Sequence, residues 1–136
     1  MTDKFQNYIA LVVEDDASGL AIISVMLRRI GVRTVMERYA SSALERAQKM
    51  TSVDMIFLDL GLPDGDGYEV LAQLKKEPTL KNVPIIAVTA RDASTEIAKA
   101  QAAGFNGFLG KPLNRNRFPD QIRRIMEGEG VWEVYH

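Results

Sequence analysis

Short apolar runs alternate with longer amphipathic stretches along most of this chain. Three of the runs are rich in Val and Ile and have the length of buried strands, at residues 8–13, 55–58 and 83–88. A fourth run, 34–39, mixes apolar and charged residues, which indicates a more exposed strand. The fifth, 105–109, is weaker and has two glycines nearby, so we expect it at an edge of the sheet.

Between these runs, apolar residues recur at helical spacing. Leu20, Ile23 and Leu27 share one face of a predicted helix, and Gly31 is placed to end it. The stretch 92–103 is rich in alanine and carries Ile97 as its one large apolar residue. We therefore expect this fourth helix to be weakly anchored. Two further helical faces are formed by Leu71 and Leu74 and by Phe118, Ile122 and Ile125.

Strand and helix alternate five times, which predicts an α/β fold with a parallel five-stranded sheet between two layers of helices. Strands of this length favour the flavodoxin-like (βα)5 three-layer sandwich with strand order 2-1-3-4-5. We expect a single domain over residues 1–136, with its core at about 8–127 and a tail at 128–136 outside the pattern. Ligands in such sheets bind beyond the carboxyl ends of the strands.

The composition excludes several classes of protein. Seventeen Lys and Arg residues balance 18 Asp and Glu residues, so there is no basic footprint for direct nucleic acid binding or for an anionic membrane. The absence of cysteine excludes disulfides and thiolate metal sites. No apolar run approaches the roughly 20 residues of a membrane span, and the first seven residues are polar. We expect a cytoplasmic protein with no membrane contact.

Polar residues follow four of the predicted strands. Glu14 and Asp15 come after the first strand, Asp59 after the third, Thr89 after the fourth and Lys111 after the fifth. In a parallel sheet these carboxyl ends meet at one edge.

Each of these residue types has a use at such a site. Clustered carboxylates raise one another's pKa, so they favour a nearby cation, and hard oxygen ligands suit Mg²⁺. A carboxylate can also accept a phosphoryl group, whose charged oxygens a metal, an ammonium and a hydroxyl would orient. Asp15 and Asp59 could hold the metal, while Lys111 and Thr89 could bind phosphoryl oxygens.

Four motifs in this order resemble the receiver domain of two-component response regulators, over about residues 9–126. Each motif lies at a predicted strand end. The motifs are Val12-Val13-Glu14-Asp15-Asp16, the run from Phe57 to Gly67, Val88-Thr89-Ala90 and Lys111-Pro112.

The resemblance implies a role for each residue of the site. Asp59 is the expected phosphoacceptor, Asp15 and Asp59 are direct ligands of Mg²⁺ or Mn²⁺, and Glu14 holds the metal through water. The backbone carbonyl of Gly61 completes the protein ligands, and Lys111 contacts the phosphoryl group.

The resemblance also implies a switch. Thr89 is the expected switch hydroxyl and Phe108 the switch aromatic residue, which turns inward when Thr89 moves toward the phosphoryl group. The peptide bond before Pro112 is expected to be cis, as proline allows.

The expected phosphodonor is a sensor histidine kinase or a histidine phosphotransfer protein. Output would pass to a downstream protein target or through a homodimer formed by the fourth helix, fifth strand and fifth helix. Such a protein catalyses only its own phosphorylation and dephosphorylation, so we do not expect a conventional enzyme.

Several residues allow a plainer interpretation. Asp16 has the place of a helix-start residue, and Asp64 and Asp66 precede glycines, as turn residues do. Ile22, Val25 and Met26 form a second apolar patch on the first helix. This patch is either core or a docking surface for the phosphodonor.

Three positions depart from the family pattern. Gly61 leaves the site more open than the larger residue usual there, and we expect Gly61 and Arg91 together to set the lifetime of the phosphorylated form. Phe108 replaces the common Tyr and cannot donate a hydroxyl hydrogen bond. Pro119 fits only the first turn of a helix, so the last helix should begin late, with Asn116 as its cap.

Two rival functions remain open. A pseudo-receiver would bind partners without phosphate, which the presence of Asp59, Lys111 and Thr89 disfavours. A phosphohydrolase of the haloacid dehalogenase type needs a second Asp two residues after its nucleophile, where this chain has Gly61.

Overall fold

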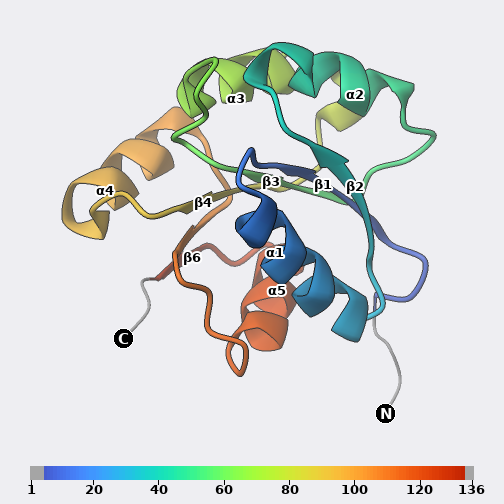
Figure 1. Ribbon diagram of the computed structural model, residues 1–136, viewed down its shortest axis with the longest axis vertical. Helices are drawn as coiled ribbons and strands as arrows, with labels where there is room; N and C mark the ends of the chain where they lie inside the picture. Colours follow the sequence, from blue (N-terminus) through green and yellow to red (C-terminus); the bar gives the residue numbers. More distant parts are fainter. Residues whose placement is uncertain (1–4, 134–136) are drawn as a thin grey trace.

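The computed structural model describes residues 5–133 as a six-stranded parallel sheet with helices on both faces (Figure 1). The strands lie in the order β2-β1-β3-β4-β5-β6. Their bounds are β1 Ile9–Val13, β2 Arg33–Glu37, β3 Met55–Leu58, β4 Ile85–Thr89, β5 Gly107–Gly110 and β6 Val131–Glu133. The predicted flavodoxin-like order 2-1-3-4-5 is confirmed, and one further strand extends it.

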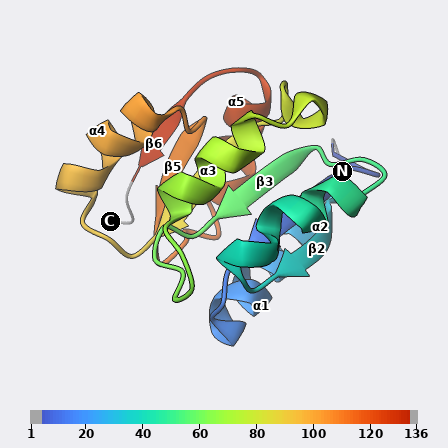
Figure 2. The ribbon, with the colours of Figure 1, turned by 90° about the horizontal axis from the view of Figure 1, so that it is seen from above.

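Helices α1 and α5 cover one face of the sheet, and α2, α3 and α4 cover the other (Figures 1 and 2). Their bounds are α1 Ala17–Arg29, α2 Ala43–Lys49, α3 Gly67–Lys75, α4 Ala93–Ala103 and α5 Phe118–Met126. Two short 3-10 helices, η1 Ala40–Ser42 and η2 Pro78–Leu80, lie in the connections. Within residues 5–133, no helix combines the length and apolar character needed to cross a membrane.

Each face of the sheet has its own apolar core, because successive residues of a strand point to opposite faces. Leu11 and Val13 of β1 belong to the core under α2, α3 and α4. Ala10 and Val12 belong to the core under α1 and α5. Strands β1, β3 and β4 are therefore buried from both sides, whereas β2 at the edge is partly exposed, as its mixed composition predicts. The carboxyl ends of the strands are left as the place where polar side chains can gather.

The expectation that the fifth strand lies at an edge is wrong. β5 lies between β4 and β6, because the chain after α5 returns to pair with it. β6 has only three residues, too few to show an apolar alternation of their own. Residues 134–136 of the predicted tail lie outside the described residues.

The last helix begins late, as Pro119 predicts, and this proline is its second residue. The expected cap at Asn116 is wrong. The side-chain oxygen of Asn114 accepts hydrogen bonds from the backbone N–H groups of Asn116 and Arg117, at 2.9 and 3.2 Å. Asn114 thus forms the turn that leads into α5, and the N-cap position falls at Arg117.

The fourth helix, α4, has the weak anchor that its sequence predicts. Ala100 is its one buried residue, and Ile97 is only partly buried against the core. Asp92 caps α4 by accepting a hydrogen bond from the backbone N–H of Ser94. A helix held by so little apolar contact can shift at small cost in free energy.

Candidate functional site

The carboxyl ends of β1, β3 and β5 bring four charged side chains together. Glu14 and Asp15 follow β1, Asp59 follows β3, and Lys111 follows β5. Backbone hydrogen bonds beyond the strands fix these positions: Asp59 N–H donates to the Val13 carbonyl at 3.0 Å, and Lys111 N–H donates to the Thr89 carbonyl at 2.9 Å. The residues gathered from distant parts of the sequence therefore lie on rigid strand ends.

Three of these side chains form an acidic cluster. Glu14, Asp15 and Asp59 each offer one carboxylate oxygen, and the three oxygens lie within 4.8 Å of one another. The cluster has three carboxylates against the one ammonium of Lys111, so negative charge is in excess. A divalent cation would balance this excess, and all-oxygen ligands suit Mg²⁺ or Mn²⁺. The donor set therefore fits the expected metal.

Lys111 bridges two of the carboxylates. Its ammonium donates a hydrogen bond to Oε1 of Glu14 and lies 3.5 Å from Oδ2 of Asp59. Burial raises the pKa of Glu14, Asp59 adds to this rise, and the hydrogen bond from Lys111 opposes it. Burial disfavours the charged ammonium, but Glu14 and Asp59 outweigh that effect and raise the pKa of Lys111. The lysine is thus held protonated beside the Asp59 carboxylate.

Two glycines allow the close packing around this cluster. A Cβ on Gly19 in α1 would lie 2.9 Å from Oε1 of Glu14. A Cβ on Gly67, the first residue of α3, would lie 2.8 Å from the Cα of Leu60 and 2.9 Å from the carbonyl oxygen of Asp59. Both helices can therefore begin directly against the site only because these positions carry no side chain.

The loop after Asp59 is open on one side. Gly61 N–H donates to Oδ1 of Asp59 at 3.0 Å, and a Cβ on Gly61 would meet only that oxygen, at 3.9 Å. Arg91 reaches this loop from the end of β4: its Nη2 donates to the Leu60 carbonyl at 3.1 Å, and its Nη1 lies 3.5 Å from Oε1 of Glu96. Arg91 thus spans the loop next to Gly61, the residue with which the sequence analysis pairs it.

Thr89 is the last residue of β4, and Phe108 lies in β5 in register with Ala87 of β4. Thr89 is buried, and its hydroxyl oxygen accepts a hydrogen bond from the backbone N–H of Arg91 at 3.2 Å. Phe108 is fully buried within the core under α2, α3 and α4. The peptide bond between Lys111 and Pro112 is cis.

A cavity of about 340 Å³ adjoins the charged cluster. Glu14, Asp59 and Lys111 line one part of it, and apolar residues line most of the rest, among them Ile22 and Leu113. Apolar walls limit the access of water, which strengthens interactions between the charges and a bound anion.

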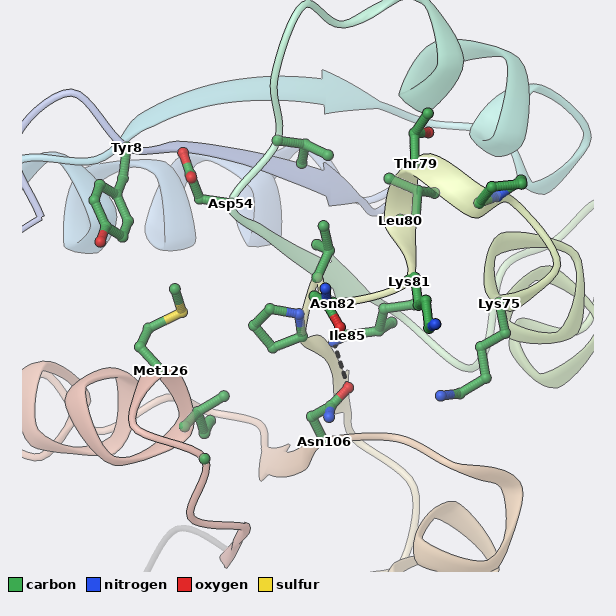
Figure 3. Close-up of a pocket in the computed structure, with 16 residues that line it drawn as sticks. Tyr8, Asp54, Lys75, Thr79, Leu80, Lys81, Asn82, Ile85, Asn106 and Met126 are labelled. Atoms are coloured by element: carbon green, nitrogen blue, oxygen red, sulfur yellow. Dashed lines mark hydrogen bonds between the residues drawn. The ribbon is translucent and has the colours of Figure 1, made fainter.

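A larger groove of about 750 Å³ lies at the opposite end of the sheet (Figure 3). Two of its polar side chains bind backbone groups of the strands: Asp54 accepts a hydrogen bond from Ile9 N–H, and Asn106 accepts one from Ile85 N–H, both at 2.8 Å. The acidic cluster and Lys111 do not line this groove. We therefore place the candidate site at the smaller cavity.

The other aspartates near the site have the plainer roles considered above. Asp16 caps α1 by accepting from Gly19 N–H at 2.8 Å, and Asp66 caps α3 by accepting from Tyr68 N–H at 3.0 Å. Asp64 accepts from the backbone of η1, and these hydrogen bonds lower its pKa. They bind backbone rather than joining the cluster.

The second apolar patch of α1 divides into two parts. Met26 is 8% exposed and belongs to the core, whereas Ile22 and Val25 are 51% and 45% exposed. Only Ile22 and Val25 are therefore available to a partner.

Sequence reasoning missed Arg38, which follows β2. Its guanidinium donates two hydrogen bonds to the backbone carbonyl of Asp15, at 2.9 and 3.3 Å. Arg38 thereby holds the loop that carries the acidic pair. The rule that found the other residues, which is to inspect each strand's carboxyl end, would have found Arg38 if it had been applied to the second strand.

Comparison with known proteins places these features in one family. The family model described as the response regulator receiver domain matches residues 10–123. The polar-differentiation response regulator DivK of Brucella anthropi is 28% identical over 116 residues, which cover 85% of this chain and 94% of DivK. The sensor histidine kinase CheAY of Helicobacter pylori is 27% identical over 91% of this chain, and the match spans only 16% of CheAY.

A solved structure shows the same likeness. The receiver domain of the sensor histidine kinase PA1611 from Pseudomonas aeruginosa is 29% identical, with a TM-score of 0.78 over 88% of this chain and 98% of that one. That structure has a magnesium ion coordinated in its active site cleft.

Proposed function

Because this chain belongs to the response regulator receiver domain family of two-component systems, we propose that Asp59 accepts a phosphoryl group and that the aspartyl phosphate changes the protein's interactions. One observation supports this above all. The Asp59 carboxylate lies within 4.8 Å of the carboxylate oxygens of Glu14 and Asp15, and 3.5 Å from the ammonium of Lys111. An acceptor, a metal site and a cation for the phosphoryl oxygens are thus side by side.

The proposed transfer forms an acyl phosphate. One carboxylate oxygen of Asp59 attacks the phosphorus of a phosphohistidine, the new O–P bond forms, and the N–P bond breaks with its electron pair left on the imidazole. Lys111 moves its hydrogen bond from Glu14 to the phosphoryl oxygens. Asp15, Asp59, the Gly61 carbonyl and, through water, Glu14 would hold Mg²⁺, which when bound neutralises charge on the transferred group.

The proposed switch begins at Thr89. Its hydroxyl would turn to donate to the phosphoryl group and so give up the hydrogen bond from Arg91 N–H. Arg91 is tied to Glu96 in α4, and α4 has little apolar anchoring, so the start of this helix can respond. Phe108 would adjust within the space that Thr89 leaves. A preference of a few kcal/mol between the two states is sufficient for such a switch.

The proposed partners follow from the same chemistry. The donor is a sensor histidine kinase or a histidine phosphotransfer protein. Its docking surface is formed by exposed Ile22, which lines the cavity, and by exposed Val25 on the same helix. A downstream protein, or a homodimer, receives the signal. We further propose that residues 1–136 form one receiver domain that acts in the cytoplasm and whose catalysis is limited to its own phosphorylation and dephosphorylation.

Intact mass after incubation with Mg²⁺ and a small-molecule phosphodonor tests this function. We expect native protein to gain the mass of one phosphoryl group and Asp59→Asn to gain none. Asp120→Asn is the matched control, because Asp120 is an exposed carboxylate paired with Arg123 on α5. It should be modified as the native protein is.

The same experiment separates the rivals. A native chain that stays unmodified, and that shows no spectral change with Mg²⁺ and beryllofluoride, is a pseudo-receiver. Turnover of a generic phosphate ester would indicate a phosphohydrolase instead. Modification that persists in Asp59→Asn would show that the acceptor is another residue.

A further inference from the structure

β6 covers the outer edge of β5, between α4 and α5 (Figure 2). The pairing is parallel and in register, with Val131 beside Gly107, Trp132 beside Phe108 and Glu133 beside Leu109. An open edge would present a row of unpaired backbone groups to other chains. β6 therefore occupies the place that a partner would need along β5, on the surface from which the family resemblance predicts output.

The chain reaches this edge through a tight reversal at the end of α5. Gly128 has φ of 91°, which is the left-handed region that glycine adopts without strain. Its N–H donates to the Ile125 carbonyl at 3.0 Å, and Glu129 N–H donates to the Arg124 carbonyl at 2.9 Å. This pair of bonds ends the helix and sends the chain back beside β5.

Glu133 holds the short strand in place. Its carboxylate accepts hydrogen bonds from Gln121 at 2.9 Å and from Arg124 at 3.1 Å, and it is also bonded to Arg117. Three donors from α5 and the residue before it thus converge on one side chain of a three-residue strand. This ionic clasp, formed by Glu133 with Arg117, Gln121 and Arg124, adds to the apolar packing of β6, in which Val131 is buried in the core under α1 and α5 and Trp132 packs against the other core.

One short segment of chain runs from the candidate site to the contacts of Glu133. Residues 111–117 link β5 to α5, with Lys111 in the site at one end and Arg117 on Glu133 at the other. Movement of Lys111 from Glu14 to a phosphoryl group would displace this segment. Trp132 is also the register neighbour of Phe108, so a change at Phe108 reaches β6 directly.

We propose that β6 is a displaceable strap, which covers the β5 edge while Asp59 is unmodified and is released when Asp59 carries a phosphoryl group, opening the surface of α4, β5 and α5 to a partner. This inference rests on the proposed function. According to this proposal, the switch produces its output by releasing β6, and not by rotation of Phe108 alone.

Trp132 is the chain's one tryptophan, so its fluorescence reports on β6 alone. We would measure quenching by acrylamide and hydrogen exchange at the amides of residues 131–133, with and without Mg²⁺ and beryllofluoride. For native protein we expect easier quenching and about tenfold faster exchange in the beryllofluoride state. Glu133→Gln should show that faster exchange before any addition. Glu129→Gln is the matched control, since Glu129 lies 3.7 Å from Arg124 and outside the strand, and it should behave as native protein does.

The outcomes separate the two proposals. If mass spectrometry shows modification at Asp59 while quenching and exchange at β6 stay unchanged, the strap is overturned and the proposed function stands. If the amides of residues 131–133 exchange no faster in Glu133→Gln than in Glu129→Gln, Glu133 does not hold β6 in place. If the protein takes up neither phosphoryl group nor beryllofluoride, both the function and the phosphate-linked release fail.

Discussion

Lys111 donates a hydrogen bond to Glu14, a residue 97 positions earlier in the chain. This contact partners a buried carboxylate and at the same time places an ammonium 3.5 Å from Asp59. The cluster nevertheless keeps more carboxylates than ammonium groups, because no salt bridge among residues 5–133 pairs the Asp15 carboxylate, and Arg38 binds only the backbone carbonyl of Asp15. This excess of negative charge favours the binding of a divalent cation.

Divalent cations should stabilise the protein. We expect saturating Mg²⁺ to raise the midpoint of thermal unfolding by roughly 5–10 °C, because a ligand at a hundred times its Kd adds about 2.7 kcal/mol to the free energy of unfolding. Asp15→Asn and Asp59→Asn should lose most of this shift and, without metal, should be at least as stable as native protein, since each removes a like charge. Circular dichroism melts with Mg²⁺ and then with chelator measure both effects. Equal Mg²⁺ shifts in all three proteins would contradict the metal site.

The lifetime of the phosphorylated form should depend on Gly61 and Arg91. Gly61→Met adds a side chain where only Asp59 Oδ1 lies within 4 Å, so it should fit, restrict water and slow dephosphorylation several-fold. Arg91→Ala removes the guanidinium from the Leu60 carbonyl and should speed dephosphorylation by a similar factor.

Decay of the phosphorylated mass after removal of the donor gives both rates. Arg91→Lys serves as the control, because it keeps a positive charge without the forked pair of contacts. If Gly61→Met and Arg91→Ala leave the rate unchanged, the proposed role of this pair is wrong.

The α1 patch should separate into docking and core. Ile22→Ser changes a residue that is 51% exposed, so it should leave unfolding within about 0.5 kcal/mol of native while it slows phosphotransfer from a histidine donor. Met26→Ser changes a residue that is 8% exposed, so it should lower the free energy of unfolding by about 2–4 kcal/mol.

Urea unfolding and phosphotransfer assays on both variants test this division. Modification by a small-molecule donor is the internal control, because such a donor does not need the docking surface. Unimpaired transfer to Ile22→Ser would show that the phosphodonor docks elsewhere.

The docking of β6 should depend on pH through Glu133. The hydrogen bond from Gln121 and the charges of Arg117 and Arg124 lower the pKa of this carboxyl below its ordinary 4.5. A lowered pKa in the docked state contributes stability that is present above the ordinary value and is lost as the pH falls through the docked value. We therefore expect Trp132 fluorescence to shift as the pH falls below the ordinary carboxyl value of 4.5.

Glu133→Gln should show no such transition, and far-UV circular dichroism at each pH distinguishes release of β6 from global unfolding. The nearby Glu129, which pairs with Arg124, is the other acid that could contribute, and Glu129→Gln tests it. An acid transition of Trp132 that is identical in Glu133→Gln would contradict the clasp.

Local pattern alone was sufficient for much of this protein. The apolar runs and helical spacings predicted the strands and helices, because buried strands and amphipathic helices carry their periodicity within a few consecutive residues. Their fivefold alternation then favoured the observed strand order. The rule that ligands bind at strand carboxyl ends brings Asp15, Asp59 and Lys111 to one edge of the sheet from their sequence positions alone. Pro119 likewise indicated the late start of the last helix from its missing N–H.

Long-range pairing decided what the pattern did not contain. β6 has three residues. They form a strand only because they pair with the edge of β5 and because Glu133 binds α5. Exposed Ile22 and buried Met26 are equally apolar in sequence, and only the packing of α1 against its neighbours distinguishes them. The sequence determined which elements form and where charge gathers, since those follow from local periodicity. Tertiary contacts decided which edge is covered and which side chains face a partner, since those depend on residues far apart in the chain.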